Sequence, residues 1–459
     1  MLTAEKMAEW CDGIWKGGLP TSINSFCIDT RLIQRGDIFI ALSGKDRDGH
    51  NYLKAAFDGG AVGAIVADNK FNSEVCSSPC LLVKDPAEAL VEIATNYRKA
   101  VAPKIIVVTG SVGKSTVKEL IAQMSATTFK TAKTKGNWNN NIGLPLSIMA
   151  MERDTEVGVF ELGMNHPGEL EPLCTIAAPD CSVVTNVGAV HLEFFDSVEA
   201  IAAEKSVVLK RMSGNGIAVL ECDGDYFDLL NNVATGEVKT VSLNNKVDYY
   251  CVQRNIAEGT AVVCEKNSGD KIVLPMPLPA DFNVLNVLFA VGVARWLGVD
   301  WDNIIHSLKN FKAMPMRWDK VMVNDLLFIN DAYNANPISM YAAIEAFYFE
   351  QKSKSKWLIL GGMLELGKCE FEEHIALGTF IASMDWSGLI VVGELGGLIA
   401  DGAVSHGMPH ASIYRCENNN IAADIVRQNI GQDSAVLLKG SRSFKLEEVI
   451  DIIREREVV

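Results

Sequence analysis

The sequence lacks the paired cysteines of a zinc site or of a redox dithiol. Its 11 cysteines are scattered over 459 residues without a Cys-x-x-Cys pair. Cys76 and Cys80 are the closest two, and no histidine or further cysteine lies near them. Cysteines in such positions are usually buried or incidental. We therefore expect incidental thiols in a reduced, cytoplasmic protein.

The chain also lacks long apolar runs and an excess of positive charge. No uninterrupted apolar run approaches the roughly 18 residues of a membrane-spanning helix, and residues 1–15 carry acidic side chains instead of the apolar core of a signal peptide. The formal net charge is −15, which argues against binding to nucleic acid or to an anionic membrane. An acidic protein can still bind phosphates through a local loop, a helix terminus and metal ions.

Composition and length indicate an ordinary globular protein of several domains. Hydrophobic residues make up 48% of the chain and charged residues 22%, which is enough apolar material for several cores. At roughly 150 residues per domain, a chain of this length holds about three domains. No heptad pattern, tandem repeat or low-complexity tract stands out.

Strand-like and helix-like stretches alternate along the chain, which predicts an α/β fold. The predicted strands lie at residues 37–42, 64–67, 105–108, 158–162, 181–185, 216–220, 326–329, 357–360, 389–392 and 435–438. The predicted helices lie at residues 52–57, 87–100, 116–125, 200–212, 339–350, 371–384 and 421–428. Shorter alternating runs at 248–264 predict an antiparallel edge.

These stretches fall into three predicted domains. A small N-terminal α/β domain covers residues 1–102, and a central phosphate-loop domain with a parallel sheet covers 103–313. A C-terminal Rossmann-like α/β domain covers 314–459. We expect a linker at 101–104, where Pro103 stands, and a second boundary at 311–315.

The stretch at 105–116 is the strongest functional signal. Four β-branched residues at 105–108 run into a glycine-bearing turn and then a helical pattern, which is the order strand, phosphate loop, helix. Backbone amides of such a loop cradle a nucleotide's phosphates. In this arrangement Lys114 reaches the terminal phosphates and the Ser115 hydroxyl binds Mg²⁺. Val108 stands where the general pattern has glycine, so a strand-to-helix turn that binds nothing stays an alternative.

Glu161 ends a predicted strand next to the phosphate loop. A carboxylate at the carboxyl end of a parallel strand lies at the mouth of the phosphate site, where it could hold Mg²⁺. A glutamate that ends its strand facing solvent is the alternative.

Three further segments carry polar side chains whose role the residues alone leave open. The segment 137–145 holds four amides in five residues, and an ordinary Asn-rich loop would have the same composition. His191 follows another strand and could be structural. Lys205 lies on the predicted helix 200–212, where a lysine usually extends its ammonium to solvent. In the N-terminal domain, polar loops at 27–31 and 44–50 leave strands and could hold ligands or be solvated turns.

An ordered series of motifs resembles the Mur ligase family of ATP-dependent amide-bond ligases over nearly the whole chain. Its central part comprises Gly-Lys-Ser at 113–115, Asn-x-Asn-Asn-x-Ile-Gly-x-Pro at 137–145, Glu-x-Gly-Met-Asn at 161–165, Asn-Val-Gly-x-x-His-Leu-Glu at 186–193, Ala-x-Glu-Lys at 202–205 and Phe-Asn-Val-Leu-Asn at 282–286. Its C-terminal part comprises Met-Arg-Trp at 316–318, Asp-Ala-Tyr-Asn-Ala-Asn-Pro at 331–337, Gly-Met-Leu-Glu-Leu-Gly at 362–367, His374 and Lys-Gly-Ser-Arg-Ser at 439–443.

The resemblance implies a set of nucleotide and metal ligands. ATP phosphates would be bound by the loop residues Gly110, Ser111, Val112, Gly113, Lys114, Ser115 and Thr116. One Mg²⁺ would be bound by Ser115 and Glu161, and a second by His191 and by Lys205 carbamylated with CO₂. Lys114, Glu161, His191 and Lys205 would be the catalytic residues.

The resemblance also implies contacts outside the phosphate site. Asn283 would contact adenine, and Arg317 and Asp331 would contact the nucleotide from the third domain. Thr30 and Arg31 would lie at the uridine diphosphate end of the substrate. The remaining substrate-binding residues would be Asn139, Asn140, Asn334 and Asn336. Two positions depart from the family pattern, because Phe282 stands where some relatives have histidine and Met316 stands where glycine is common.

Within the family, three segments favour one substrate pair. Tyr-Asn-Ala-Asn-Pro at 333–337, Met-Leu-Glu-Leu-Gly at 363–367 and Lys-Gly-Ser-Arg at 439–442 resemble the member that adds D-alanyl-D-alanine to UDP-N-acetylmuramoyl-tripeptide in peptidoglycan precursor synthesis. The Asp-Asn-Pro-Arg motif of the diaminopimelate-adding ligase is missing from the sequence. The resemblance implies a monomer that forms an acyl phosphate from ATP. The alternatives are another Mur-type or folylpolyglutamate synthetase-like ligase, and a non-enzymatic nucleotide-gated binding protein.

Overall fold

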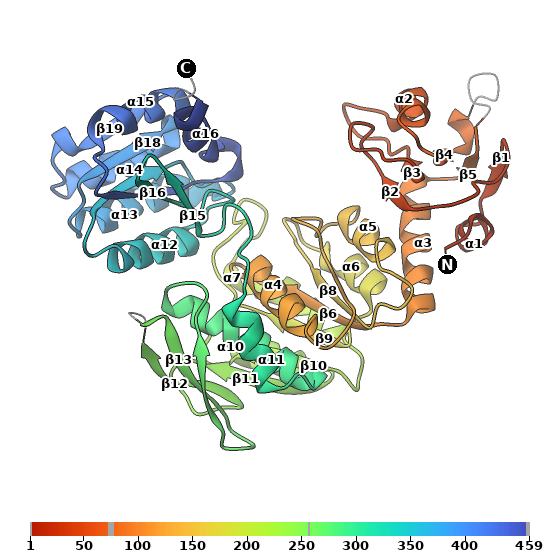
Figure 1. Ribbon diagram of the computed structural model, residues 1–459, viewed down its shortest axis with the longest axis horizontal. Coiled ribbons are helices and arrows are strands. Elements are labelled where there is room, and N and C mark those ends of the chain that lie inside the picture. The colour runs from red at the N-terminus through yellow and green to blue at the C-terminus, as the bar shows by residue number, and fades with distance from the viewer. Residues whose placement is uncertain (1, 72–77, 256–257, 456–459) are drawn as a thin grey trace.

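A computed structural model describes residues 2–71, 78–255 and 258–455 of the chain. Within these ranges the strands form three sheets of five, nine and six strands, which lie at residues 14–83, 104–275 and 319–439. Figure 1 shows three α/β bodies, with the C-terminal body at the upper left, the N-terminal body at the upper right and the central body between and below them. The expected α/β class with three domains is confirmed.

The N-terminal body has one mostly parallel sheet. Its strands are β1 (Ile14–Lys16), β2 (Ser25–Cys27), β3 (Asp37–Ile40), β4 (Gly63–Ala67) and β5 (Cys80–Val83), in the order β1-β5-β4-β3-β2, with β1 antiparallel to β5. Its helices are α1 (Ala4–Trp10), α2 (Leu53–Asp58) and α3 (Pro86–Val101). Helix α3 begins where the Asp85 carboxylate accepts the amide of Ala87, an arrangement that stabilises a helix start.

The linker expected at 101–104 is wrong in its extent. Val101 still belongs to α3 and Lys104 already belongs to the first strand of the central sheet. Helix α3 ends because Ala102 adopts a left-handed conformation with φ 55°, and Pro103 cannot continue a helix. Only two residues therefore connect the first two bodies. Of the closest cysteine pair, Cys80 is buried and Cys76 lies outside the described residues.

The central body holds the largest sheet. Its strands are β6 (Lys104–Thr109), β7 (Thr131–Lys133), β8 (Val157–Glu161), β9 (Cys181–Val184), β10 (Ile217–Glu221), β11 (Glu237–Ser242), β12 (Tyr249–Asn255), β13 (Thr260–Glu265) and β14 (Lys271–Pro275). They follow the order β14-β13-β12-β11-β10-β9-β6-β8-β7. The strands from β7 to β12 pair in parallel, whereas β12, β13 and β14 pair antiparallel. The antiparallel edge expected at 248–264 is confirmed.

Helices cover both faces of this sheet. They are α4 (Lys114–Ser125), α5 (Gly143–Met149), α6 (Leu170–Ala177), α7 (Val198–Lys205), α8 (Val207–Lys210), α9 (Phe227–Val233), α10 (Asp281–Leu297) and α11 (Trp301–Lys309). Ile106 and Val108 of β6 pack into the core under α4 and α10, and Ile105 and Val107 pack into the core on the other face. A run of β-branched residues fits this strand because successive side chains point to opposite, equally buried faces.

The prediction of a single helix at 200–212 is wrong. The segment forms two helices, α7 and α8, which are separated at Ser206. The Ser206 hydroxyl donates to the carbonyl of Ala203 at 2.7 Å. Such a side-chain hydrogen bond competes with the backbone hydrogen bonds of the helix. Helix α7 consequently ends at Lys205, next to this break.

The C-terminal body is a second doubly wound α/β unit. Its strands are β15 (Asp319–Val323), β16 (Leu326–Asn330), β17 (Ser355–Leu360), β18 (Gly388–Val392), β19 (Ile413–Cys416) and β20 (Ser434–Lys439), in the order β15-β16-β20-β17-β18-β19. Its helices are α12 (Pro337–Glu350), α13 (Glu370–Ala382), α14 (Gly393–Ser405), α15 (Asn419–Asn429) and α16 (Glu447–Glu455). All pairs are parallel except β15 with β16.

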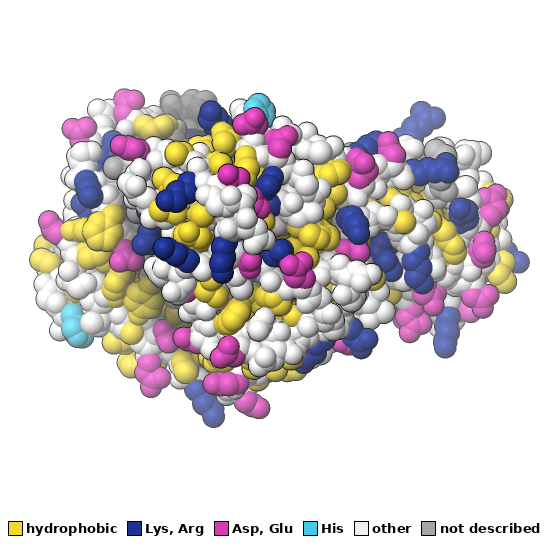
Figure 2. Space-filling view, turned by 90° about the horizontal axis from the view of Figure 1, so that it is seen from below, with side chains coloured by type: hydrophobic (Ala, Val, Ile, Leu, Met, Phe, Trp, Pro, Cys, Tyr) yellow, Lys and Arg dark blue, Asp and Glu magenta, His cyan; other side chains and the backbone are white. Residues whose placement is uncertain are grey.

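The surface carries charges of both signs. On the face shown in Figure 2, Lys and Arg side chains are interspersed with Asp, Glu and apolar side chains, and no single sign covers it. Of the helices in the described ranges, none combines the length and the apolar character needed to cross a lipid bilayer. This face therefore offers no extended basic surface for phosphate, and a phosphate site would depend on a local loop or helix terminus.

Candidate active site

The turn between β6 and α4 has the shape of a phosphate loop. Gly110 has φ 147°, and a Cβ there would lie 1.9 Å from the Thr185 hydroxyl oxygen. Gly113 has φ 85°, and a Cβ there would lie 2.7 Å from the Asn286 side-chain oxygen. Helix α4 begins at Lys114, two residues before the expected start. The amides of its first turn have no acceptor within the helix and are the donors that such a loop offers to phosphate.

Asn186 fixes the shape of this loop from the end of the neighbouring strand β9. Its side-chain oxygen accepts the amides of Ser111 at 3.1 Å and Val112 at 2.9 Å. Thr185 donates its hydroxyl to the Val112 carbonyl at 2.6 Å. The sequence contained Asn186 within a family motif but did not indicate this role. The signal was its position at the end of a strand parallel to β6.

Lys114 is partly buried at the base of the loop. Its ammonium donates to the Gly110 carbonyl at 2.8 Å. Burial lowers the pKa of Lys114, the nearby Glu161 carboxylate opposes this shift, and the charge of Arg317 adds to it. A cation held here at the expense of its hydration is stabilised when an anion enters.

Glu161 lies beside the loop and does not face solvent. It is 2% exposed, which excludes the solvent-facing alternative. One carboxylate oxygen accepts the Ser115 hydroxyl at 2.7 Å, and the other accepts the Asn139 amide at 2.8 Å. Carboxylate and hydroxyl oxygens are the hard ligands that Mg²⁺ prefers. The donor set of Ser115 and Glu161 therefore fits this cation.

Arg317 reaches the same place from the C-terminal body. Its guanidinium donates to the Ser115 hydroxyl at 3.2 Å and lies 4.2 Å from the centre of the Tyr333 ring. Met316 precedes it with φ 59°. A left-handed residue is easiest to accommodate as glycine, which accounts for the glycine that is common at this position.

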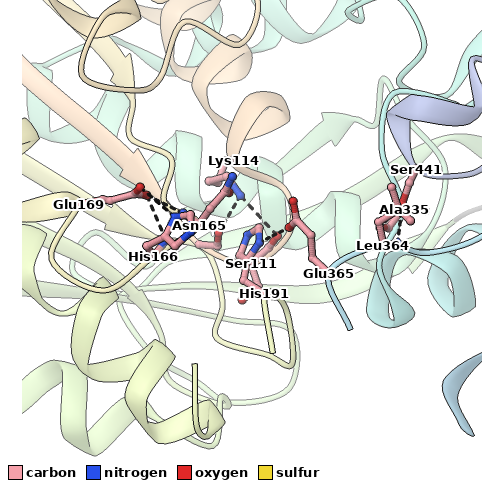
Figure 3. A network of polar contacts seen from close by, with 11 residues as sticks. Ser111, Lys114, Asn165, His166, Glu169, His191, Ala335, Leu364, Glu365 and Ser441 are labelled. Carbon is pink, nitrogen blue, oxygen red and sulfur yellow. Dashed lines mark hydrogen bonds and ion pairs between the residues drawn. The ribbon is translucent and has the colours of Figure 1, made fainter. Parts of the chain in front are cut away.

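His191 faces the C-terminal body. Its Nδ1 lies 2.5 Å from a carboxylate oxygen of Glu365, and Figure 3 shows the ring beside Ser111 and Lys114. This hydrogen bond lowers the pKa of Glu365, partly opposed by burial. Glu365 lies within a family motif, but the sequence indicates no role for it, because nothing local connects residues so far apart in the chain.

Lys205 ends α7 and is 1% exposed. The alternative that it extends its ammonium to solvent is therefore wrong. Burial lowers the pKa of Lys205 well below its ordinary value, and the charge of Lys114 lowers it further. The shift is toward the neutral amine, which is the form that reacts with CO₂. The residue thus fits the carbamate chemistry that the family resemblance implies.

The described residues do not form a conventional metal site by themselves. In these ranges no group of three or more His, Cys, Asp or Glu side chains is placed to hold a metal ion. A cation near Glu161 or His191 would need further oxygen ligands from phosphate, from Ser115 or from a carbamate on Lys205.

A cleft of about 880 Å³ lies between the central and C-terminal bodies. Nine of the predicted site residues line it, namely Ser111, Lys114, Asn139, Asn140, Glu161, His191, Arg317, Asn334 and Asn336. Its wall also includes Glu169, Tyr333, Glu365, Ser441 and Arg442, which were not predicted. The cleft is large enough for a substrate beside the phosphate loop.

Several of the lining amides also support the local backbone. Asn140 accepts the amides of Ile142 and Gly143 before α5. Asn336 caps α12 by accepting the amide of Ser339. Their side chains are thereby fixed at the cleft wall.

Other predicted residues lie away from the cleft lining. Asp331 accepts the Lys439 ammonium at 2.6 Å and the Trp318 amide at 3.1 Å, so it supports the segment that carries Arg317. Asn283, on α10, donates to the carbonyl of Pro279 just before the helix and accepts from the side chain of Asn286.

Thr30 and Arg31 are not brought to the phosphate loop. They belong to the N-terminal body, where Arg31 pairs with Asp29 and its side chain is 81% exposed. They therefore lie in a different body from Lys114 (Figure 1).

Known proteins share this architecture. Residues 108–294 match the family described as "Mur ligase middle domain". Residues 316–442 match the family described as "Mur ligase, glutamate ligase domain". The UDP-N-acetylmuramoyl-tripeptide–D-alanyl-D-alanine ligase of Bacillus subtilis is 32% identical over 94% of this chain and 93% of its own. A crystal structure of MurF from Acinetobacter baumannii has a TM-score of 0.85 at 26% identity and covers 99% of this chain and 98% of its own. The MurF ligase from Thermotoga maritima in complex with ADP has a TM-score of 0.79 at 27% identity, with 94% and 97% covered.

The fold and the site define a three-domain α/β enzyme with a phosphate loop at the wall of an interdomain cleft. The chain belongs to the Mur ligase family of ATP-dependent ligases. The expected enzyme class is confirmed, and the alternative of a non-enzymatic nucleotide switch is set aside.

Proposed function

We propose that this protein joins D-alanyl-D-alanine to UDP-N-acetylmuramoyl-tripeptide and converts ATP to ADP and phosphate. Curated relatives similar over nearly the whole chain carry that name, which supports the substrate pair. The single structural observation that supports it is the convergence of Lys114, Glu161 and Arg317 on one cleft. The reaction belongs to peptidoglycan precursor synthesis in the cytoplasm, and we propose that the chain acts as a monomer.

In this proposal each of the three domains binds a different part of the substrates. Residues 1–102 bind the uridine diphosphate end through Thr30 and Arg31. Residues 103–313 bind ATP through the phosphate loop, with Asn283 near adenine. Residues 314–459 close on the nucleotide through Arg317, with Asp331 supporting it, and bind the incoming dipeptide. Asn139, Asn140, Asn334 and Asn336 line the cleft and would contact the reacting ends of the substrates.

The chemistry proceeds in two steps. A carboxylate oxygen of the tripeptide attacks the γ-phosphorus of ATP, the bond to the bridging oxygen breaks, and ADP leaves. The dipeptide amine then attacks the acyl carbon, phosphate leaves with its oxygen, and the amine loses a proton. A carboxylate is a poor electrophile, so activation must come first. Lys114 and Arg317 stabilise the negative charge of the transferring phosphoryl group.

Two Mg²⁺ ions are part of this proposal. Ser115 and Glu161 would hold one, and His191 and a carbamate on Lys205 would hold the other. When bound, these ions would neutralise phosphate charge. Carbamylation forms a bond between the neutral Lys205 nitrogen and the carbon of CO₂ and releases a proton, which converts a neutral amine into an anionic oxygen ligand.

A coupled assay with defined substrates tests the proposal. Phosphate release should require ATP, Mg²⁺, the UDP-tripeptide and D-alanyl-D-alanine together. Replacement of the dipeptide by glutamate or diaminopimelate, or of the tripeptide by a folate, should abolish it. Equal release with another pair would assign the chain to a different ligase of the family.

A further inference from the structure

Two residues with unusual backbone conformations meet across the interface of the central and C-terminal bodies. His191 has φ 56° and Glu365 has φ 64°. Residues other than glycine rarely adopt this left-handed backbone conformation. The His191 Nδ1 and a Glu365 oxygen lie 2.5 Å apart, and Figure 3 shows the imidazole turned toward the carboxylate. Strained residues persist where the surrounding structure holds them for a function.

The backbone around this pair is fitted closely. The Glu193 amide donates to the Glu365 carbonyl at 3.3 Å. Gly367 has φ 55°, and a Cβ there would lie 3.1 Å from the Glu193 Cα. On the other side of the loop, a Cβ at Gly188 would lie 2.1 Å from the Ile338 side chain. The segment 186–195 is therefore held between the phosphate loop and the C-terminal body.

A purely stabilising ion pair does not account for this arrangement. The Glu365 side chain is 40% exposed and the His191 side chain 18%. An ion pair that solvent reaches on one side adds little to stability. A surface ion pair that only stabilises the fold does not require two residues in the left-handed conformation or such a close approach of the two backbones.

The chemistry of the pair points to a different role. An ionised carboxylate can only accept hydrogen bonds, so Nδ1 of His191 must donate its N–H to Glu365, and Nε2 is left as the ring nitrogen that can bind a cation. Histidines that bind metals almost always donate their other N–H to a carboxylate, carbonyl or water, which fixes the ring.

We infer that Glu365 is a positioning residue, which holds His191 in the tautomer and orientation that let Nε2 bind a divalent cation. Because Glu365 belongs to the C-terminal body, the second metal position is complete only when that body is docked on the central one. This inference rests on the proposed function, in which His191 is a metal ligand. It couples domain docking to the assembly of the catalytic centre.

Metal affinity distinguishes positioning from stabilisation. Mn²⁺ binding is measured by electron paramagnetic resonance in the full-length protein with a non-hydrolysable ATP analogue. Glu365→Ala should weaken Mn²⁺ binding by about 10- to 100-fold, the range typical of such outer partners. Glu365→Gln keeps a neutral acceptor and should lie between Glu365→Ala and the unmodified protein. Glu372→Ala, an exposed change in the nearby helix α13, should have no effect.

Glu365→Asp separates the effect of position from that of backbone strain. Aspartate adopts the left-handed conformation more readily than most residues, so this variant should fold, but its carboxylate is withdrawn from His191. It should weaken Mn²⁺ binding as Glu365→Ala does and raise the Mg²⁺ concentration for half-maximal turnover more than it lowers kcat. Unchanged Mn²⁺ affinity in folded Glu365→Asp would overturn the inference.

The experiment does not depend on turnover. If the unmodified protein binds Mn²⁺ but releases no phosphate with both substrates, the proposed function fails while the Glu365 variants still decide the inference. If it binds no Mn²⁺ beside the ATP analogue, the role given to Glu365 is contradicted.

Discussion

At the scale of single residues, burial decides what the sequence left open. A strand-end glutamate and a helical lysine each have ordinary surface explanations. Glu161 and Lys205 are instead 2% and 1% exposed, so each must have a partner, a ligand or a changed protonation state. Burial of these two positions depends on packing between elements, which no local pattern in the sequence reports.

Lys114 should be essential for turnover but not for folding. Loss of one preorganised charge at the transferring group typically costs 100- to 1000-fold, so Lys114→Ala should lower kcat by at least about 100-fold. Phosphate release and circular dichroism together test this. Lys104→Ala, whose side chain at the start of the same strand β6 is 61% exposed, is the control and should behave as the unmodified protein. Near-normal turnover of Lys114→Ala would contradict the phosphate assignment.

Lys205 should make activity depend on dissolved CO₂. Because burial favours its neutral amine, removing bicarbonate should lower the rate, and adding it back should restore the rate. Lys205→Ala should lose most activity and regain part of it with acetate or another short carboxylate, whereas Lys205→Arg should not be rescued. Steady-state rates in degassed and bicarbonate-supplemented buffer measure this. A rate independent of bicarbonate, together with no rescue, would remove the carbamate.

At the scale of elements, the alternation of strands and helices was predictable, and their ends were less so. The β-branched run of β6 is visible in the sequence because both faces of that strand are buried. The break at Ser206 and the end of α3 at Ala102 depend on a hydroxyl bonded to a carbonyl and on a left-handed residue. Neither has a composition that a sequence pattern marks.

The end of β10 gives a prediction on pH and stability. Burial, together with the charge of Asp223, raises the pKa of Glu221 to about 7. A group with a raised folded pKa stabilises the fold at low pH and loses that contribution as pH rises through the folded pKa. Glu221→Gln mimics the protonated form, so it should leave Tm unchanged at pH 5 and raise it by about 2–4 °C at pH 8.

The matched control for that change is Glu237→Gln at the start of β11. Its carboxylate is 63% exposed, so the substitution should shift Tm little at either pH. Thermal unfolding followed by circular dichroism is sufficient. A Glu221→Gln variant with the same shift at both pH values would show that Glu221 titrates normally.

At the scale of the whole molecule, the site is assembled by bodies that are distant in the sequence. The motifs named the expected site residues, and nine of them line one cleft. They did not predict that Glu365 faces His191, or that Asn186 holds the phosphate loop, since these contacts depend on how the bodies and strands pack. They also did not predict that Asp331 pairs with Lys439 away from the cleft lining.

The separation of the N-terminal body from the phosphate loop should appear in the kinetics. Arg31→Ala should raise KM for the UDP-tripeptide about tenfold, the loss of one charge-assisted contact, and leave KM for ATP unchanged. Arg35→Ala, in the same body, should change neither. Initial rates with each substrate varied in turn measure both constants. An equal rise in KM for ATP would contradict the division of binding between the bodies.

The most direct test of the central claim follows an oxygen atom. The tripeptide carboxylate is labelled with oxygen-18, and the phosphate released during ligation is analysed by mass spectrometry. Because phosphate leaves with the carboxylate oxygen that attacked ATP, each ligation should transfer one labelled oxygen to phosphate. Phosphate without label, released while the amide forms, would contradict an acyl phosphate and the account built on it.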